Sequence, residues 1–169
     1  GHRSGWFVDA GLVSCIVALA CLLFRGRGIP VCVWFFAKDK SAGKQGATDR
    51  TGQVLFIDAR ELGFMVDRAE RSLAPEDIAK IAETYHAWRG SSSAVAQGLS
   101  YADVPGFCAS VPLADIKAAE YALTPGRYVG AAEVADDGED IDVKVERLTT
   151  DLFRVLDESA RLDAVVRAA

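Results

Sequence analysis

LVSCIVALACLLF, from Leu12 to Phe24, is a mostly apolar run that determines how the rest of the chain is interpreted. Its first part, Val13 to Leu19, is β-branched in places and apolar at successive positions. A short strand of this kind is typical of a sheet that is covered on both faces. The run therefore predicts a central strand of an α/β fold.

The same run could be mistaken for a membrane span or for the core of a signal peptide. It is shorter than the roughly 20 residues that a spanning helix needs. Arg25, Gly26 and Pro30 end its apolar character, and Asp9 lies inside the would-be leader. We therefore expect no membrane-spanning segment here.

Two further strands are expected after this run. Ile29 to Lys38 (IPVCVWFFAK) is apolar and has a proline at its start, where the missing N–H is tolerated. Gln53 to Asp58 (QVLFID) follows a polar, glycine-rich loop. Because that loop joins the second and third strands, we expect them to form an antiparallel pair at a sheet edge.

From about Glu61 the sequence pattern becomes helical. Between Pro75 and Gly90 apolar residues recur every three or four positions, and Pro112 to Glu120 predicts another short helix. We therefore divide the chain into the C-terminal part of an α/β domain, residues 1–66, and a helical tail, residues 67–169.

The end of the chain predicts a long helix with an apolar seam. The seam residues are spaced by four, three, four, three and four positions, which is typical of a heptad repeat interrupted by one serine. They are Leu148, Leu152, Val155, Ser159, Leu162 and Val166. Such a seam needs a helical partner, which is either the chain's own helices or another subunit.

The composition narrows the possible functions. The chain has 169 residues, of which 50% are hydrophobic and 25% charged, and this is typical of a globular domain. Its net charge of −5 disfavours a purely electrostatic nucleic-acid binder. Neither a P-loop pattern nor a strand-linked G-x-G-x-x-G occurs, so the sequence does not predict a glycine-rich loop that binds nucleotide phosphates.

Cysteine and histidine do not suggest a metal site. The cysteines lie in apolar segments, without C-x-x-C pairs or histidines at ligand spacing. We expect them to be buried, reduced thiols: Cys15, Cys21, Cys32 and Cys108. His86 is expected on the surface of a helix.

Charged residues near the end of the third strand are interpreted as surface ion pairs. Asp58 and Glu61 could pair with Arg60 or Arg68. Exposed pairs of this kind contribute little free energy. We assign them no catalytic role.

Three stretches are distinctive: IPVCVWFFAKDK at Ile29 to Lys40, VLFIDARELG at Val54 to Gly63 and LTPGRYVG at Leu123 to Gly130. Between the last two come Glu76 to Gly90 and Tyr101 to Ser110. In order and spacing, these segments resemble the modification subunits of type I restriction-modification systems. The resemblance covers nearly the whole chain. It implies the C-terminal strands of a Rossmann-like, S-adenosylmethionine-dependent methyltransferase sheet, followed by a helical tail.

The resemblance also implies a function. Members of this family are cytoplasmic adenine-N6 DNA methyltransferases that use S-adenosylmethionine. They assemble with a specificity subunit, which reads double-stranded DNA, and with a restriction subunit. The glycine-rich cofactor motif and the Asn-Pro-Pro-aromatic motif of the family occur nowhere in this sequence, and we expect both upstream of Gly1. The chain alone is then inactive, and a non-catalytic assembly module is the alternative.

The turn after the first strand matches the family segment that borders the target-base pocket. Methylation requires the adenine to leave the duplex, and stacking helps to hold the flipped base. The resemblance makes Phe24, Ile29 and Pro30 candidates for lining that pocket, with a core position as the alternative for Phe24. The chain has Ala20-Cys21 and Gly26-Arg27 where the family commonly has Pro-Asp and Asn-Thr or Gly-Thr.

Two further assignments follow from the resemblance. Arg127, in the Pro-Gly turn of LTPGRYVG, is a candidate contact to DNA phosphate or to another subunit, with a structural ion pair as the alternative. The family packs its C-terminal helices against the coiled-coil region of the specificity subunit. This would provide the helical partner that the C-terminal seam needs.

Overall fold

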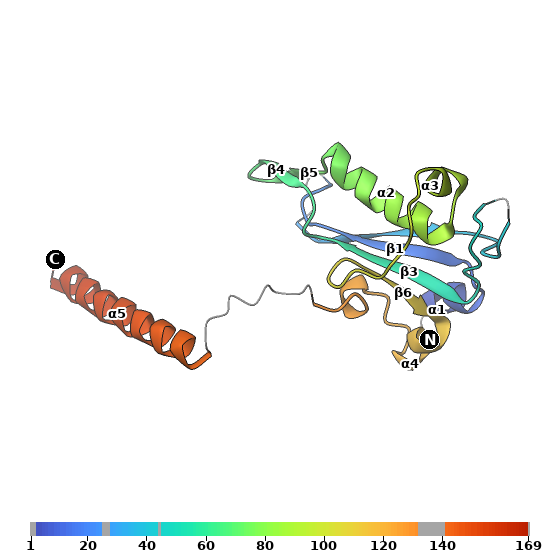
Figure 1. Ribbon diagram of the computed structural model, residues 1–169. Coiled ribbons are helices and arrows are strands. Elements are labelled where there is room, and N and C mark those ends of the chain that lie inside the picture. Colours follow the sequence, from blue (N-terminus) through green and yellow to red (C-terminus); the bar gives the residue numbers. More distant parts are fainter. Residues whose placement is uncertain (1–2, 25–27, 44, 132–140, 169) are drawn as a thin grey trace. The chain divides into compact units, whose positions relative to one another are not determined.

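The computed structural model of the chain describes residues 3–24, 28–43, 45–131 and 141–168 (Figure 1). The chain divides into two compact units, Gly1–Glu133 and Val134–Ala169. The first contains the sheets and the shorter helices, and the second contains helix α5 (Ile141–Ala168). No helix among these residues is long and apolar enough to cross a membrane.

The first unit is built on a four-stranded mixed sheet in the order β2-β1-β3-β6. β2 (Val31–Phe36) is antiparallel to β1 (Val13–Leu19), whereas β3 (Gln53–Ala59) is parallel to it. β6 (Cys108–Pro112) is antiparallel to β3. Every residue of β1 is buried, so the predicted central strand is confirmed.

The predicted antiparallel pairing of the second and third strands is wrong. β2 and β3 lie on opposite sides of β1 and do not pair with each other. The polar segment between them is long enough to pass the start of β1. Lys40 in this segment donates from Nζ to the carbonyl oxygens of Val13 (2.9 Å) and Gln53 (2.7 Å), and so joins the starts of β1 and β3.

Helices cover both faces of this sheet. α2 (Pro75–Arg89) and α3 (Ser92–Ala96) lie over one face, and α1 (Arg3–Asp9) and α4 (Leu113–Ala118) over the other (Figure 1). α2 begins at its proline and ends at Gly90, whose left-handed backbone (φ 63°) caps it as the sequence pattern predicted. α4 confirms the second predicted helix.

Strands interrupt the segment that was predicted to be helical. β4 (Phe64–Asp67) and β5 (Glu70–Ser72) form a two-stranded hairpin, and β6 joins the main sheet. The division at residue 66 therefore differs from the structure, in which the first unit extends to Glu133. The physical reason is a pairing between segments far apart in sequence. β6 forms backbone hydrogen bonds with the outer edge of β3, and local periodicity does not reveal such a pairing.

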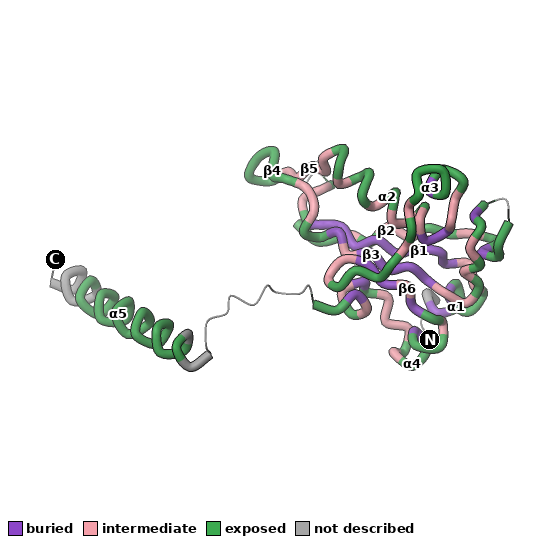
Figure 2. Tube along the Cα trace, viewed as in Figure 1, coloured by how far each residue is buried: buried purple, intermediate pink, exposed green. Residues whose placement is uncertain are grey.

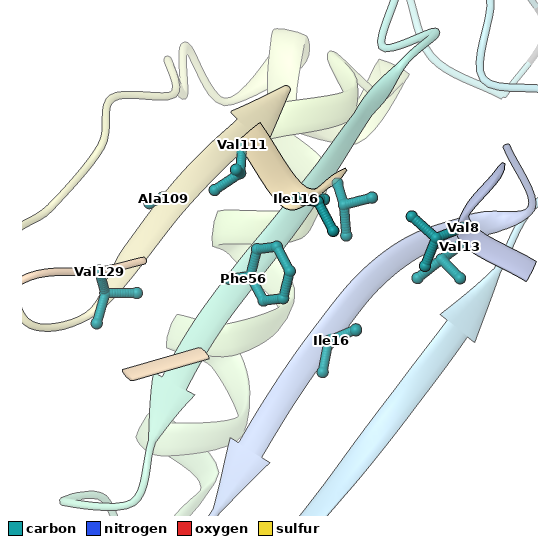
Figure 3. Packing of buried hydrophobic residues seen from close by; sticks show 9 residues of the cluster. Val8, Val13, Ile16, Phe56, Ala109, Val111, Ile116 and Val129 are labelled. Atoms are coloured by element: carbon teal, nitrogen blue, oxygen red, sulfur yellow. The ribbon is translucent and has the colours of Figure 1, made fainter. Parts of the chain in front are cut away.

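Two apolar clusters, one on each face of the sheet, hold the unit together. Buried residues are concentrated in β1, β3 and β6 (Figure 2). On the α4 face, Phe56 lies at the centre of the first cluster (Figure 3) and stacks on Tyr128, with ring centroids 4.4 Å apart. On the α2 face, Trp88 is fully buried and donates from Nε1 to Ser110 Oγ at 2.8 Å. The indole thereby ties α2 to β6.

The cysteines differ from expectation in two of four cases. All four are free, as predicted, and Cys15 and Cys108 are buried. Cys21 and Cys32 are exposed instead. Cys21 lies in the turn after β1, and Cys32 lies on the edge strand β2, whose side chains are only half-buried or exposed.

Replacing Phe56 by alanine should strongly destabilise the first unit. Phe56 has 0% exposure, and its removal would leave a cavity beside Tyr128. We expect a loss of about 3–5 kcal/mol in the free energy of unfolding, measured by urea denaturation. Val104→Ala, at a side chain with 46% exposure, is the control and should cost less than about 1 kcal/mol. Equal losses would contradict this packing.

Lys40 should make stability depend on pH. Burial, together with the nearby Arg89, lowers the pKa of Lys40 from 10.5 to about 8. The folded chain therefore releases this proton at lower pH than the unfolded chain, so stability should rise as the pH increases from about 8 to about 10.5. Over this range the free energy of unfolding of the parent chain should increase by on the order of 1–3 kcal/mol more than that of Lys40→Met. A difference that is independent of pH would refute this interpretation.

Candidate functional site

The carboxyl ends of β1 and β3 form the candidate site. The two strands are parallel and Leu19 pairs with Ala59, so they end at the same edge of the sheet. β2 starts at this edge, because Val31 pairs with Leu19. Ligands of open α/β sheets bind outside the carboxyl ends of the strands.

The turn between β1 and β2 presents apolar side chains at this edge. Phe24 has 50% exposure and Ile29 63%, and Pro30 is also exposed. Phe24 is therefore not part of the core formed by the described residues. Of the departures from the family pattern, Ala20 is buried and Cys21 exposed, whereas Gly26 and Arg27 lie outside the described residues.

A backbone contact holds this turn to the β4–β5 hairpin. Leu22 has a left-handed backbone (φ 66°), which a leucine adopts only when its surroundings enforce it. Its carbonyl oxygen accepts a hydrogen bond from the backbone N–H of Arg71 in β5 at 3.0 Å. The hairpin base is thus fixed beside the turn that carries Phe24.

The end of β3 carries an ion pair. Arg60 donates to both carboxylate oxygens of Asp58, from Nε at 2.8 Å and from Nη2 at 2.6 Å. These hydrogen bonds from Arg60 lower the pKa of Asp58. The predicted pairing of Asp58 with Arg60 is confirmed, and Arg68 is exposed without an ion pair to any described residue.

The LTPGRYVG segment packs against this ion pair. It contains the short helix η1 (Pro125–Arg127), and a Cβ atom added at Gly126 would lie 2.7 Å from Arg60 Nη2. The ring of Tyr128 then stacks on Phe56 of β3. Glycine at position 126 permits this close approach, and a side chain there would displace the end of Arg60. Arg127 is exposed and forms no ion pair with any residue that the structure describes.

The structure brings together segments that are far apart in sequence. The turn after β1, the end of β3 and the LTPGRYVG segment meet at one edge, whereas the seam of α5 belongs to the other unit. The described seam leucines and valine are 51–57% exposed: Leu148, Leu152, Val155 and Leu162. Val166 lies in α5, but its side chain is outside the described residues.

Two apolar groups were missed by the sequence analysis. Phe153 and Leu156 of α5 are also exposed, at 61% and 52%, and they widen its apolar face. The hairpin residues Phe64, Met65 and Val66 are exposed at 53%, 45% and 57%. The signal for the hairpin was weak: a short apolar run after Gly63 and a charged turn.

Arg60→Gln should raise the pKa of Asp58 towards its ordinary value. The cause is loss of the charged hydrogen bonds that lower it. Since this pKa is lowered in the folded chain, the pair stabilises the fold near neutral pH, and this contribution is lost as the pH falls through the pKa of Asp58. Carboxyl NMR titration measures the shift, and we expect a stability loss below about 1 kcal/mol at pH 7. Arg68→Gln is the matched control, and an Asp58 pKa unchanged by Arg60→Gln would contradict the pairing.

The chain is similar to known DNA methylases. The N-6 DNA Methylase family matches residues 5–137 of the chain. The chain is 43% identical over 160 residues to the type I restriction enzyme HindI methylase subunit of Haemophilus influenzae, covering 95% of this chain and 33% of that protein. It is 32% identical to the MjaIX methylase subunit of Methanocaldococcus jannaschii, covering 92% of this chain and 26% of that protein.

A solved structure shares the fold. It is the methyltransferase subunit of a type I restriction-modification system from Streptococcus thermophilus, with a TM-score of 0.57 and 20% sequence identity. The match covers 76% of this chain and 22% of that one. The chain thus spans about a third or less of the relatives it matches. From the family match and the identity to methylase subunits, the chain belongs to the N-6 DNA methylase family, among the modification subunits of type I restriction-modification systems.

Proposed function

We propose that the chain is the C-terminal part of a site-specific adenine-N6 DNA methyltransferase subunit of a type I restriction-modification system. The observation that carries this proposal is the meeting of the β1–β2 turn, the end of β3 and the LTPGRYVG segment at one edge of the sheet. The matched relatives are about three times as long or longer. Methyl transfer is therefore an activity of the whole subunit, and this chain supplies one border of its site.

In this proposal Phe24, Ile29 and Pro30 border the pocket for the target base. A flipped adenine loses its stacking partners in the duplex, and contact with apolar or aromatic side chains stabilises it in the flipped position. Phe24 and Ile29 expose apolar surface to water at a carboxyl edge. A bound base would cover that surface, so the turn has a physical reason to hold the base.

The proposed cofactor is S-adenosylmethionine, which supplies the methyl group. We do not propose the carboxylate of Asp58 as a cofactor ligand, because its side chain is only 9% exposed and both of its oxygens are bonded to Arg60. We therefore assign Asp58 and Arg60 to supporting the LTPGRYVG segment. Cofactor contacts are proposed for parts of the subunit outside this chain.

The proposed partners are the specificity subunit, which would read double-stranded DNA, and a restriction subunit. The surface for the specificity subunit is the seam of α5, whose apolar side chains are more than half exposed. A helix with an apolar stripe of this kind gains stability by packing on other helices. Arg127, exposed in η1, is a candidate contact to DNA phosphate or to a subunit.

A chimera tests the proposed activity. The aligned third of the Haemophilus influenzae methylase subunit is replaced by this chain, and DNA methylation is measured with labelled S-adenosylmethionine in the presence of the specificity subunit of that relative. We expect methylation by the chimera, and a loss of about five- to 150-fold with Phe24→Ala because stacking contributes about 1–3 kcal/mol per base. Val95→Ala, on α3, should keep full activity. A chimera that folds and binds both subunit and cofactor, yet does not methylate, would contradict the proposal.

A second candidate function is a non-catalytic assembly module, and the exposed face of α5 favours it. Calorimetry with S-adenosylmethionine separates the two candidates when this chain is compared with a form of itself extended upstream. Binding by the extended form but not by this chain alone supports the methyltransferase. Binding by neither favours the assembly module, and binding by this chain alone would overturn the division of roles between the chain and the rest of the subunit.

A further inference from the structure

The four-stranded sheet has two outer strands, β2 and β6, and they differ in how they are protected. β6 is five residues long and ends at Pro112. Its Ser110 donates the backbone N–H to Asp103 Oδ1 at 3.0 Å, and Cys108 donates its backbone N–H to the carbonyl oxygen of Val104 at 2.9 Å. Short outer strands, prolines and covering loops prevent pairing with further strands. The loop before β6 therefore blocks that edge of the sheet.

The edge formed by β2 lacks these devices. Its six residues, VCVWFF, include neither a charged residue nor a proline. Apart from its pairing with β1, the backbone of residues 31–36 forms no hydrogen bond with any residue that the structure describes. Alternate N–H and C=O groups of an antiparallel outer strand point away from its neighbour. A row of backbone donors and acceptors along β2 is therefore available for pairing.

The face of β2 towards α2 borders an apolar cleft of about 430 Å³. Val33 and Phe35 line this cleft from the strand, and Ile78 and Tyr85 line it from α2. Phe35 is 45% exposed and Ile78 56%, although a sheet and the helix that covers it normally bury such side chains between them. On this face, the described residues leave apolar surface beside β2 uncovered.

The opposite face of β2 also exposes aromatic side chains. The rings of Trp34 and Phe36 lie 6.2 Å apart, and Phe7 of α1 lies 5.6 Å from Phe36. Trp6, which contacts Phe7, is 66% exposed, and Phe36 is 57% exposed. Successive residues of a strand point to opposite faces, so apolar surface flanks the open edge on both sides. A layered sheet is apolar on both faces where both faces are covered.

We propose that the open edge of β2 pairs with a β-strand from the part of the methylase subunit that this chain does not span, and that apolar side chains of that part fill the cleft between β2 and α2. The inference rests on the proposed function, which makes the chain one part of a longer subunit. The alignment with the Haemophilus influenzae relative covers 95% of this chain but 33% of that protein, so about two thirds of the relative lies outside it. This length is ample for a further strand and its covering layer.

The pairing locates the rest of the subunit relative to the candidate site. β2 starts at the edge that carries Phe24, because Val31 pairs with Leu19. A strand paired with β2 therefore has one end beside this turn. The cofactor contacts proposed outside this chain then approach Phe24 from the β2 side of the sheet, and the blocked edge at β6 faces away from them.

Hydrogen exchange measured by mass spectrometry tests the pairing. The isolated chain is compared with the chimera, and exchange is followed in peptides from β1, β2 and β6. Amides of β2 should exchange about 100-fold or more slowly in the chimera, because pairing protects those that now face water. β6 is the control at the other edge, and its gain in protection should be at least about tenfold smaller.

A charged side chain at the cleft provides a second measurement. Phe35→Lys should reduce the protection of β2 in the chimera by about tenfold or more, because a lysine there opposes the packing of a further layer. It should also lower the urea midpoint of the chimera more than that of the isolated chain, in which Phe35 is already 45% exposed. The matched control Val95→Lys, at a side chain with 61% exposure on α3, should do neither.

Three results would overturn the inference. The first is equal protection of β2 in the isolated chain and in a folded chimera. The second is protection that appears in the isolated chain as its concentration rises and does not increase in the chimera, which would identify a second copy as the partner. If β1 is unprotected, the chimera is unfolded, and the intact Haemophilus influenzae subunit is measured instead. There, faster exchange in the segment aligned with β2 than in the segment aligned with β6 is the third.

The outcome is independent of the test of methyl transfer. If the chimera methylates DNA while β2 stays unprotected, the pairing inference fails and the proposed function stands. If β2 becomes protected but the folded chimera does not methylate, the pairing holds and the proposed enzymatic role fails.

Discussion

The parallel pairing of β1 with β3 is the constraint on which the rest of the structure depends. It requires the chain to leave β1, return along β2 and pass the start of β1 before β3 begins, a crossing that Lys40 fixes with hydrogen bonds to both strand starts. It also places the ends of β1 and β3 at one edge. Because β1 is buried along its whole length, both faces of the sheet need a covering layer, and α2 and α4 supply it.

The candidate site is therefore a consequence of topology rather than of one motif. Phe24 follows β1, Arg60 follows β3, and Gly126 comes from a segment much later in the chain. The contact between Gly126 and the Asp58–Arg60 pair joins the last two of these, and the hydrogen bond between Leu22 and Arg71 joins the first to the hairpin. Each contact is modest in energy, but together they define one edge.

The sequence predicts elements whose signals are local. β1 was predicted from its apolar run, and α2 from its spacing, its proline and its terminal glycine. β6 was missed because CASVP is short and contains Ser110 and Pro112, and its strand character depends on pairing with β3. The order of the strands was missed for the same reason. Phe24 was identified only through resemblance, and the contact between Gly126 and Arg60 has no local signal at all.

The central claim is that the edge carrying Phe24 faces the target base. Photo-crosslinking tests this most directly: the chimeric subunit with its specificity subunit is bound to DNA in which 5-iodouracil replaces the target adenine, and the crosslinked peptide is identified by mass spectrometry. We expect crosslinks to the turn between β1 and β2, at Phe24 or beside it, and their loss when the iodouracil is moved several base pairs away. Crosslinks confined to α2, α3 or α5, with none in that turn, would contradict the claim.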